Sequence, residues 1–415
     1  MMNTKFDAVI MGAGIAGSTT AILLARAGWR VALVEKQSFP RRKVCGECIA
    51  AGNFPMLDAL GVGDAVAKAA GPHLRQAALM RGEFSSLADL PEAEHAKHRW
   101  GMALGRETLD SILLDQAAAN GATVFQPHMV QGVHGLVGQW QCEIRALDSK
   151  KIVSLHAPVM IDAHGSWESL HAGPARRLPL GSDLLAFKAN FRNAALQQGV
   201  LPLVLFPGGY GGMVLADQGL TTVACCIRRD QLTALRALQP GRSAGDSVEA
   251  MLKRECQGVR AALENATRDE PWLAAGPLDP RIRIQPNDTV FRVGNAAGEA
   301  HPIIGEGMSM ALQSAWLLCD RLTAAGRNNG AAPRQWQQRV AGQYDADWRR
   351  MSRSRFRIAS LFAELAMRPL GAYCLMAAVQ VWPGLINLGA RWAEKAGPLR
   401  FPSSTSTFAP TGATP

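Results

Sequence analysis

Three glycines and one acidic residue near the start of the chain have the types and spacing needed to hold a dinucleotide. Gly12, Gly14 and Gly17 form a G-x-G-x-x-G motif, and Glu35 follows at the distance typical of a ribose-binding acid. The first glycine permits a tight turn, the second lets a pyrophosphate approach the backbone, and the third lets a helix pack closely on a strand. A carboxylate at Glu35 would accept hydrogen bonds from a ribose 2′-hydroxyl and would repel a 2′-phosphate. The motif therefore predicts FAD or NAD, and not NADP, as the bound nucleotide.

The flanking sequence supplies the elements that must position these residues. An apolar run over 8–11 leads into Gly12, apolar positions at helical spacing follow Gly17, and a second apolar run over 31–34 leads to Glu35. The N-terminus of the intervening helix offers free N–H groups and the positive end of its dipole to phosphates. We therefore expect a strand, turn, helix and strand over 6–36.

Two clusters of reactive side chains follow Glu35. The basic run 41–43 would either neutralise the phosphates of the nucleotide or form a solvated loop. Cys45 and Cys48 form a C-x-x-C pair, either a redox-active dithiol or two plain thiols near the cofactor. Because no second nucleotide-binding unit follows, we favour plain thiols.

Later segments return to cofactor chemistry. Arg106 begins a predicted helix, and Asp162 ends the last of several alternating runs that predict a β-meander over 130–161. A short strand ending at Gly294, a loop with His301, and a helix opened by the glycines of 305–307 come last. Free N–H groups at that helix start favour a negatively charged ligand.

The composition predicts a large globular protein of 415 residues, with 48% hydrophobic and 19% charged residues. Only MMNTK precedes the first strand, which leaves no room for a signal peptide, so we expect a cytoplasmic protein with free cysteines. The net charge of +10 suits a membrane surface or an acidic substrate. No zinc-finger spacing or interleaved aromatic and basic motif is present, so neither a metal nor nucleic acid is predicted.

Three separated segments resemble the cofactor signatures of one family. The first glycine motif with Glu35, the turn 162–166, and Gly294-Asn295 with 305–307 are similar to single-component flavoprotein monooxygenases, the para-hydroxybenzoate hydroxylase superfamily. The segment 43–47 resembles the geranylgeranyl reductase branch of that superfamily. The resemblance implies an α/β (α+β) fold with a Rossmann-like FAD-binding domain built from several chain segments, an inserted mixed β-sheet substrate domain and C-terminal helices.

The resemblance also assigns roles to residues. Arg106 would reach the FAD phosphates, Glu35 the adenosine ribose, and Asn295 the ribityl chain, where the family has an aspartate. His164 likewise stands where the family usually has aspartate. Asn295 implies one fewer negative charge near the ribityl chain. The predicted cofactor-binding residues are Gly12, Ala13, Gly14, Gly17, Glu35, Lys36, Arg42, Arg106, Asp162, Gly294, Asn295, Pro302, Gly305, Gly307 and Met308.

The domain boundaries follow from this assignment. The FAD-binding domain is expected at 1–72, 104–175 and 281–330, with 73–103 crossing to the substrate domain at 176–280. C-terminal helices are expected over 331–401, followed by a disordered tail, 402–415. The segment 207–212 is either a surface against which a flat ring lies or a long hairpin turn.

The favoured function is an NAD(P)H-dependent monooxygenase, in which FAD reduced by NADH or NADPH captures O₂ as a hydroperoxide and hydroxylates an apolar, aromatic or polyketide-like substrate. His301 and Tyr210 are the candidate catalytic residues, each with a structural role as its alternative. A reductase of isoprenoid or other C=C bonds, of the geranylgeranyl reductase type, and a non-catalytic flavin-binding membrane-docking module are the alternatives. A tryptophan halogenase is disfavoured because no W-x-W-x-I-P segment is present.

The last helical region predicts where the substrate comes from. Residues 369–390 are uncharged and follow an arginine cluster that includes Arg349, Arg350 and Arg353. Either this region contacts the anionic inner face of a membrane, or it is a helical cap packed on the substrate domain.

Overall fold

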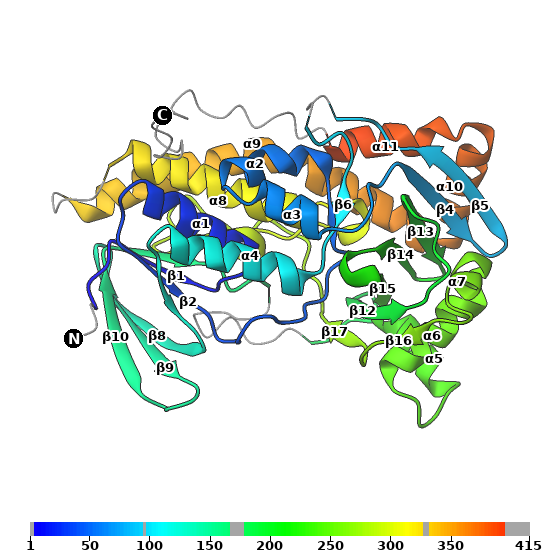
Figure 1. Cartoon of the computed structure of the whole chain (residues 1–415), viewed down its shortest axis with the longest axis horizontal. Coiled ribbons are helices and arrows are strands. Elements are labelled where there is room, and N and C mark those ends of the chain that lie inside the picture. The colour runs from blue at the N-terminus through cyan, green and yellow to red at the C-terminus, as the bar shows by residue number, and fades with distance from the viewer. Residues whose placement is uncertain (1–3, 94–96, 167–177, 327–331, 395–415) are drawn as a thin grey trace.

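Two β-sheets form the body of the molecule in the computed structural model, which describes residues 4–93, 97–166, 178–326 and 332–394 (Figure 1). The first sheet has five parallel strands in the order β18-β11-β1-β2-β7. The strands are β1 (Ala8–Met11), β2 (Val31–Val34), β7 (Thr123–Phe125), β11 (Val159–Asp162) and β18 (Phe291–Arg292). Both faces of a parallel sheet are normally covered, and β1 and β2 are accordingly apolar and buried throughout.

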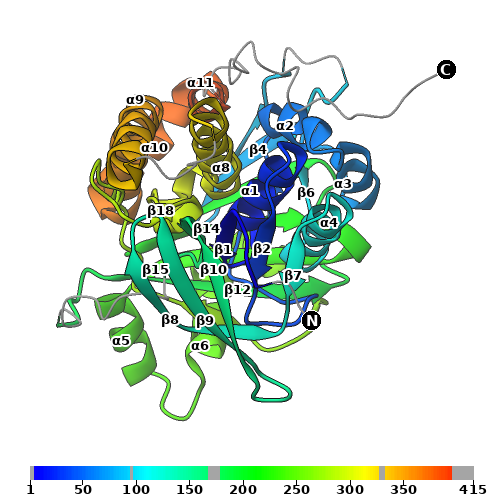
Figure 2. The ribbon, with the colours of Figure 1, turned by 90° about the vertical axis from the view of Figure 1, so that its left-hand side faces the viewer.

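Helices cover one face of the parallel sheet, and an antiparallel meander covers the other (Figure 2). Alternation along the strands sends Ile10 and Leu33 towards the helices and Val9 and Val34 towards the meander. The helices are α1 (Ile15–Arg26), α4 (Arg106–Ala119) and α8 (Gly307–Ala324), and the meander is β8 (His128–Leu136), β9 (Gln139–Ala146) and β10 (Ile152–Ala157). The predicted meander over 130–161 is therefore confirmed, except that its last strand, β11, joins the parallel sheet.

The second sheet is mixed and lies at the other end of the molecule (Figure 1). Its order is β16-β12-β15-β14-β13-β4-β5, with β17 also paired to β12, and only β4 and β13 run parallel. The strands are β4 (Gln76–Arg81), β5 (Phe84–Asp89), β12 (Leu184–Arg192), β13 (Val200–Phe206), β14 (Gly209–Leu215), β15 (Thr221–Arg228), β16 (Thr267–Arg268) and β17 (Leu273–Ala275). One face packs against helices α5 (Arg229–Ala237), α6 (Ala244–Glu255) and α7 (Gln257–Ala262).

Three C-terminal helices tie the two sheets together. They are α9 (Pro333–Met367), α10 (Pro369–Val381) and α11 (Gly384–Glu394). The long helix α9 packs along α8 and then reaches β13 and β14 of the mixed sheet. Prolines at the starts of α9 and α10 suit the first helical turn, where the missing N–H costs no bond. The C-terminal helices therefore cover the second face of the mixed sheet, and the core there is continuous with α10.

Short elements complete the connections. The pair β3 (Cys48–Ile49) and β6 (Met102–Ala103) stands where the chain crosses between the sheets. The remaining helices are η1 (Ala51–Asn53), α2 (Phe54–Ala59), α3 (Gly63–Ala69), η2 (Asp217–Gly219), η3 (Gly294–Ala296) and η4 (Pro302–Ile304).

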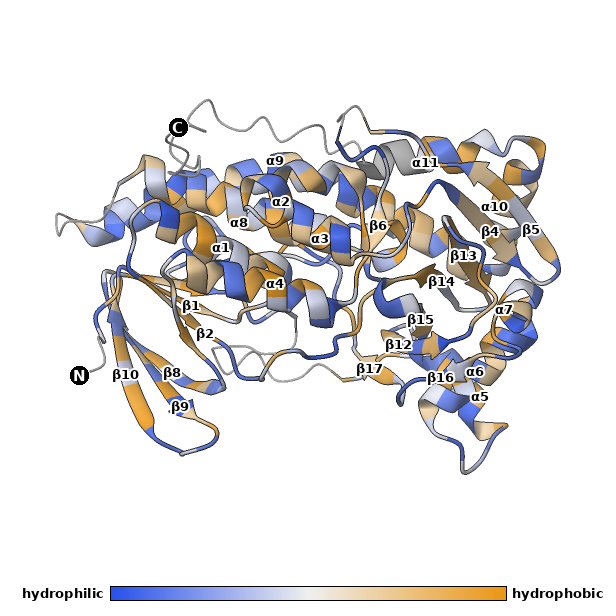
Figure 3. Cartoon of the chain, in the orientation of Figure 1, coloured by the Kyte–Doolittle hydropathy of each residue, from blue (hydrophilic) through white to orange (hydrophobic). Residues whose placement is uncertain are grey.

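The predicted fold class is confirmed, and two local interpretations are decided. Residues 207–208 form the turn of a hairpin and Gly209 begins β14, which favours the hairpin interpretation of 207–212. Strands β4 and β5 lie within 73–103, which we expected to cross to the substrate domain, and they carry small and polar residues in place of the usual β-branched ones. Figure 3 shows apolar colours along the parallel strands and α10. The predicted tail, 402–415, lies outside the described residues.

Candidate cofactor and active site

The three motif glycines have different roles in the structure. Gly12 has φ +106°, and a Cβ there would lie 2.5 Å from the carbonyl oxygen of Ala163. A Cβ on Gly17 would lie 1.8 Å from the carbonyl oxygen of Gly12. Both glycines are therefore required by the fold itself. At Gly14 the nearest atoms to a Cβ are two guanidinium nitrogens, of Arg41 and Arg106, each 3.6 Å away. Gly14 thus leaves space at the start of α1 that faces two cations.

These cations form a buried anion-binding environment. Arg106 is held by Asp110, with its Nε and Nη2 donating to the two carboxylate oxygens at 2.9 and 2.8 Å. Arg41 Nη2 lies 3.4 Å from the same carboxylate, while its buried Nε makes no hydrogen bond with any described residue. Shielding from water, with Arg106 and Arg41 nearby, lowers the pKa of Lys43 to about 8. A further positive charge is therefore unfavourable beside Arg41 and Arg106, and a bound anion would offset this repulsion.

The fit to a dinucleotide follows from this donor set. A pyrophosphate beside Gly14 would accept hydrogen bonds from the unpartnered Nε of Arg41 and from backbone N–H groups at the start of α1. Gly14 has no side chain that would keep the pyrophosphate away from these N–H groups. Arg42, which we had predicted as a cofactor residue, instead donates to Glu270 and lies 3.8 Å from Glu107. Lys36 is exposed. The contacts thus favour Arg41 over Arg42 as the phosphate ligand.

Glu35 lies at the turn where the motif predicts it. It is 7% exposed, and its Oε2 accepts a 2.9 Å hydrogen bond from the backbone N–H of Ala13. Its Oε1 accepts from the backbone N–H of Gln37, also at 2.9 Å. The carboxylate is therefore fixed at the end of β2, next to the glycine turn, while its contact with a ribose stays a prediction.

The structure brings the three cofactor segments together at the carboxyl edge of the parallel sheet. Met11, just before Gly12, pairs in register with Asp162, which in turn pairs with Arg292. Asp162 Oδ1 accepts from the backbone N–H of His164 at 3.0 Å, which closes the turn after β11. Asn295 follows β18 and donates from Nδ2 to the Ser166 hydroxyl at 3.0 Å. This convergence is where α/β sheets bind ligands.

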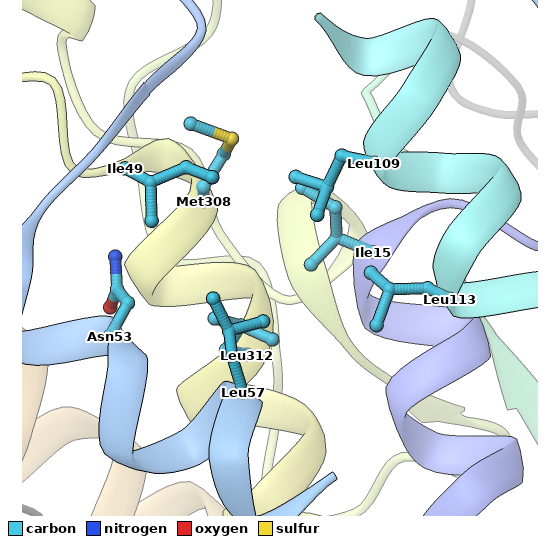
Figure 4. A pocket seen from close by; sticks show the side chains of 8 residues that line it. All are labelled: Ile15, Ile49, Asn53, Leu57, Leu109, Leu113, Met308 and Leu312. Atoms are coloured by element: carbon cyan, nitrogen blue, oxygen red, sulfur yellow. The ribbon is translucent and has the colours of Figure 1, made fainter. Parts of the chain in front are cut away.

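The loop before α8 reaches from this edge towards the mixed sheet. Gly294, with φ +62°, donates its N–H to Ser314 of α8, and Gly305, with φ +67°, ends the short helix η4. Gly307 begins α8, and Pro302 is exposed. Met308 is one of the residues that line a small apolar cavity among α1, α2, α4 and α8 (Figure 4). Met308 is itself buried, and its contact with a cofactor stays a prediction.

One candidate catalytic residue, Tyr210, lies on β14, and the other, His301, lies in this loop. Tyr210 is 4% exposed on β14, next to Cys226 of β15 and near the backbone of Ile303. Burial, with Cys226 nearby, raises the pKa of the Tyr210 hydroxyl well above its ordinary value. Burial lowers the pKa of His301, and its buried Nδ1 makes no hydrogen bond with any described residue. Tyr210 thus stays a neutral hydroxyl and His301 a neutral imidazole near neutral pH.

The C-x-x-C pair does not form a disulfide. Cys45 and Cys48 are free, as are the other six cysteines. Cys45 Sγ accepts from the backbone N–H of Glu47 at 3.4 Å, and burial raises the pKa of Cys48 to about 12. A raised thiol pKa disfavours the thiolate needed for exchange, which supports the interpretation as plain thiols.

Sequence reasoning missed a buried ion pair beside the site. Glu47 and Lys188 are 1% and 0% exposed as side chains, and Lys188 Nζ donates to Glu47 Oε1. The other carboxylate oxygen accepts from the Thr222 hydroxyl, and Oε1 also accepts from the backbone N–H of Arg106 at 3.0 Å. This pair joins the loop after Lys43 to the mixed sheet. No sequence signal could have linked residues so far apart in the chain.

Comparison with known proteins decides the family. The model of the FAD binding domain family matches residues 5–335. The chain belongs to this family of FAD-dependent oxidoreductases. It is 31% identical over 362 residues to the 1H-pyrrole-2-carbonyl-[peptidyl-carrier protein] chlorinase of Pseudomonas fluorescens, covering 79% of this chain and 78% of the relative. It is 26% identical over 347 residues to kynurenine 3-monooxygenase of Stenotrophomonas maltophilia, covering 78% and 73%.

Other relatives carry out different reactions. The menaquinone reductase of Mycolicibacterium smegmatis is 26% identical over 345 residues, covering 78% of each chain. The tryptophan 2-halogenase of Chondromyces crocatus is 25% identical, and this chain spans 66% of its length. Halogenases are thus among the relatives although the tryptophan halogenase segment is absent.

Solved structures share the fold. The chondrochloren halogenase CndH superposes with a TM-score of 0.73 at 20% identity, covering 88% of this chain and 84% of that chain. The probable FAD-dependent monooxygenase pqsL of Pseudomonas aeruginosa gives a TM-score of 0.65 at 18% identity, covering 92% and 100%. The family and fold are therefore shown, and the family resemblance inferred from the motifs is confirmed.

Proposed function

We propose that the protein is an NAD(P)H-dependent monooxygenase that hydroxylates an apolar, aromatic or polyketide-like substrate. The observation that carries this proposal is an apolar core between the mixed sheet and the C-terminal helices that ends at the cofactor loop. Among its buried members are Leu79, Leu184, Leu205, Tyr210, Cys226, Ala363, Ala366 and Met376, and Ile303 of the cofactor loop packs against it. An apolar substrate bound against this core beside Ile303 would lie next to the predicted flavin edge.

The side chains in this region suit a reaction that needs water to be excluded. Bound FAD would supply hydride acceptance from NAD(P)H and activation of O₂. The apolar residues would displace water from the substrate, and the neutral Tyr210 hydroxyl would donate a hydrogen bond to an oxygen of the substrate. Burying a charge among these apolar side chains is costly. A charged substrate would therefore be poorly accommodated.

Replacing Tyr210 with phenylalanine tests the substrate-orienting role. The variant keeps the ring that packs on Leu205 of the neighbouring strand but loses the hydroxyl, so we expect the protein to fold and bind FAD as the wild type does. Product formed per NAD(P)H oxidised should fall, because a poorly oriented substrate lets reduced flavin react with O₂ without hydroxylation. Cys226→Ala is the matched control in the same core. Equal coupling in Tyr210→Phe and the wild type would overturn the assigned role.

We further propose that the substrate arrives from an anionic membrane surface, which α10 contacts. Its buried residues Ala372, Met376 and Val379 pack on the mixed sheet. The other side of the helix is also apolar: Leu370, Tyr373 and Val381 are 79%, 70% and 88% exposed. These residues are spaced three and eight apart, as on one helical face. No single described helix has the length and apolarity to span a bilayer, although α9 and α10 qualify together despite a 103° bend.

The arginines have a smaller part in this contact than the sequence suggested. Arg349 and Arg350 pair with Asp345 and Asp347 at 2.7 and 3.2 Å, and both lie roughly 26 Å along the helix axis from Met367, the last residue of α9. Arg368, at the junction with α10, is 71% exposed. The apolar face of α10 would therefore supply most of the affinity.

Vesicle co-sedimentation tests the membrane proposal. We expect binding to phosphatidylserine-containing vesicles that weakens with salt and is lost in Tyr373→Asp and Val381→Asp. Leu238→Asp, which changes an exposed leucine near α5, is the matched control and should bind normally. Protein that stays in the supernatant with anionic vesicles at low salt contradicts the proposal. Dimerisation that is lost in the same α10 variants would assign the face to a second copy instead.

A further inference from the structure

Asn295 has an acidic neighbour in the structure that the sequence alone did not reveal. Glu299 lies one helical turn further along the loop, and its Oε1 accepts a hydrogen bond from Asn295 Nδ2 at 3.2 Å. The second hydrogen of the same amide goes to the Ser166 hydroxyl at 3.0 Å. The position that we expected to lack a negative charge therefore has a carboxylate in direct contact.

This contact fixes which way the amide faces. An ionised carboxylate only accepts hydrogen bonds, so the nitrogen of Asn295 must face Glu299 and the amide oxygen must face away from it. Both Nδ2 hydrogens are then used, which leaves Oδ1 as an acceptor. Oδ1 makes no hydrogen bond with any residue that the structure describes. An acceptor at this position is what a ribityl hydroxyl would require.

The surroundings of Glu299 hold it in place. It is 8% exposed, and its Oε2 lies 3.3 Å from Arg283 Nη2. Arg283 also donates from Nη1 to the carbonyl oxygen of Asn295 at 2.5 Å. The carboxylate contributes further to the raised pKa values of Tyr210 and Cys226, so its charge reaches the mixed sheet. Glu299 is thus a residue of the cofactor loop whose charge acts on Tyr210 and Cys226 in the apolar core.

We infer that Glu299 is a positioning residue for the cofactor: it holds the Asn295 amide with its oxygen directed at the ribityl chain and carries the negative charge that an aspartate at 295 would otherwise supply. The two residues act as a pair, because a carboxylate at both positions would place two negative charges at hydrogen-bond distance. The inference rests on FAD binding and holds whichever reaction the flavin supports.

A double-mutant cycle on FAD affinity tests the pair. Asn295→Asp alone should weaken FAD binding about tenfold or more, since a charged hydrogen bond is replaced by repulsion. That loss should shrink at acidic pH, where one of the two carboxyl groups takes up a proton. Glu299→Gln alone keeps an acceptor for Asn295 Nδ2 and should weaken binding only severalfold. The double variant Asn295→Asp/Glu299→Gln restores one carboxylate and one amide and should bind within about threefold of the wild type.

Flavin fluorescence titration of the apoproteins gives these dissociation constants. The melting temperatures of the same apoproteins, measured without FAD, show whether the two residues are also coupled in protein stability. Asn193→Asp, an exposed asparagine with φ +58°, is the matched control and should change neither. If Asn295→Asp fails to fold, recovery of folding in the double variant still supports the pair. Wild-type affinity in Asn295→Asp, or effects that simply add in the double variant, would overturn the inference.

Discussion

Gly14→Ala separates the cofactor-binding role of the glycine motif from its role in folding. Gly14 has φ −68° and ψ −175°, which alanine adopts without strain. The nearest atoms to the new Cβ are guanidinium nitrogens 3.6 Å away, at ordinary van der Waals distance. The methyl group would therefore fit the apoprotein and occupy the space in front of the start of α1, where the pyrophosphate is expected.

The magnitudes of the two effects differ widely. The free energy of unfolding of the apoprotein should change by less than about 1 kcal/mol, the usual range for glycine to alanine at a compatible backbone position. A displaced pyrophosphate would lose at least two charged hydrogen bonds, at about 1.5–3 kcal/mol each. The dissociation constant of FAD should therefore rise by roughly two to four orders of magnitude.

Flavin fluorescence titration together with urea denaturation of the apoprotein measures both quantities. Gly342→Ala, at a glycine on α9 with no atom near the new Cβ, is the control and should leave FAD affinity unchanged. Gly12→Ala should fail to fold because of its positive φ and the 2.5 Å contact with Ala163. A Gly14→Ala protein that binds FAD as tightly as the wild type would refute the reasoning.

Two further predictions concern buried charges. The pKa of Lys43 is lowered from 10.5 to about 8 in the folded apoprotein. Between these pH values the unfolded chain therefore holds a proton that the folded protein lacks, so the free energy of unfolding should increase as pH rises through this range. Lys43→Met should remove this contribution in urea titrations at several pH values; equal slopes in both proteins would contradict it. Removing one partner of the Glu47–Lys188 pair should destabilise the protein by about 3–5 kcal/mol, while Glu47→Gln/Lys188→Met should cost less than the sum of the single variants. Purely additive values would show that the two charges are not coupled.

Local patterns predicted the parts of the site that depend on neighbouring residues in the chain. The turn at Gly12, the helix beginning at Arg106 and the helix beginning at Gly307 all follow from glycine spacing and apolar periodicity. Partners distant in the chain were not predictable. Whether Arg41 or Arg42 faces Gly14 depends on how one loop folds against α4, and a run of basic residues carries no information about that.

Glu299 shows the same limit more sharply. It lies within the predicted cofactor segment, but its role depends on the side-chain direction of Asn295 and on Arg283, which approaches from a preceding loop. The asparagine at position 295, where the family has an aspartate, indicated that a nearby residue could supply the missing negative charge. The sequence could not show which residue supplies this charge, and only the structure identifies it as Glu299.

Oxygen-isotope labelling tests the central claim of a monooxygenase acting on an apolar substrate. The FAD-loaded protein is incubated with NADH or NADPH and either a long-chain alkylphenol or a polyprenyl alcohol under ¹⁸O₂, and the products are analysed by mass spectrometry. We predict a hydroxylated alkylphenol that contains one ¹⁸O atom, forms only when O₂ is present, and does not gain a halogen when chloride or bromide is added. A polyprenyl product that gains two hydrogen atoms without ¹⁸O, and forms equally well without O₂, would contradict the account and assign the protein to C=C reduction.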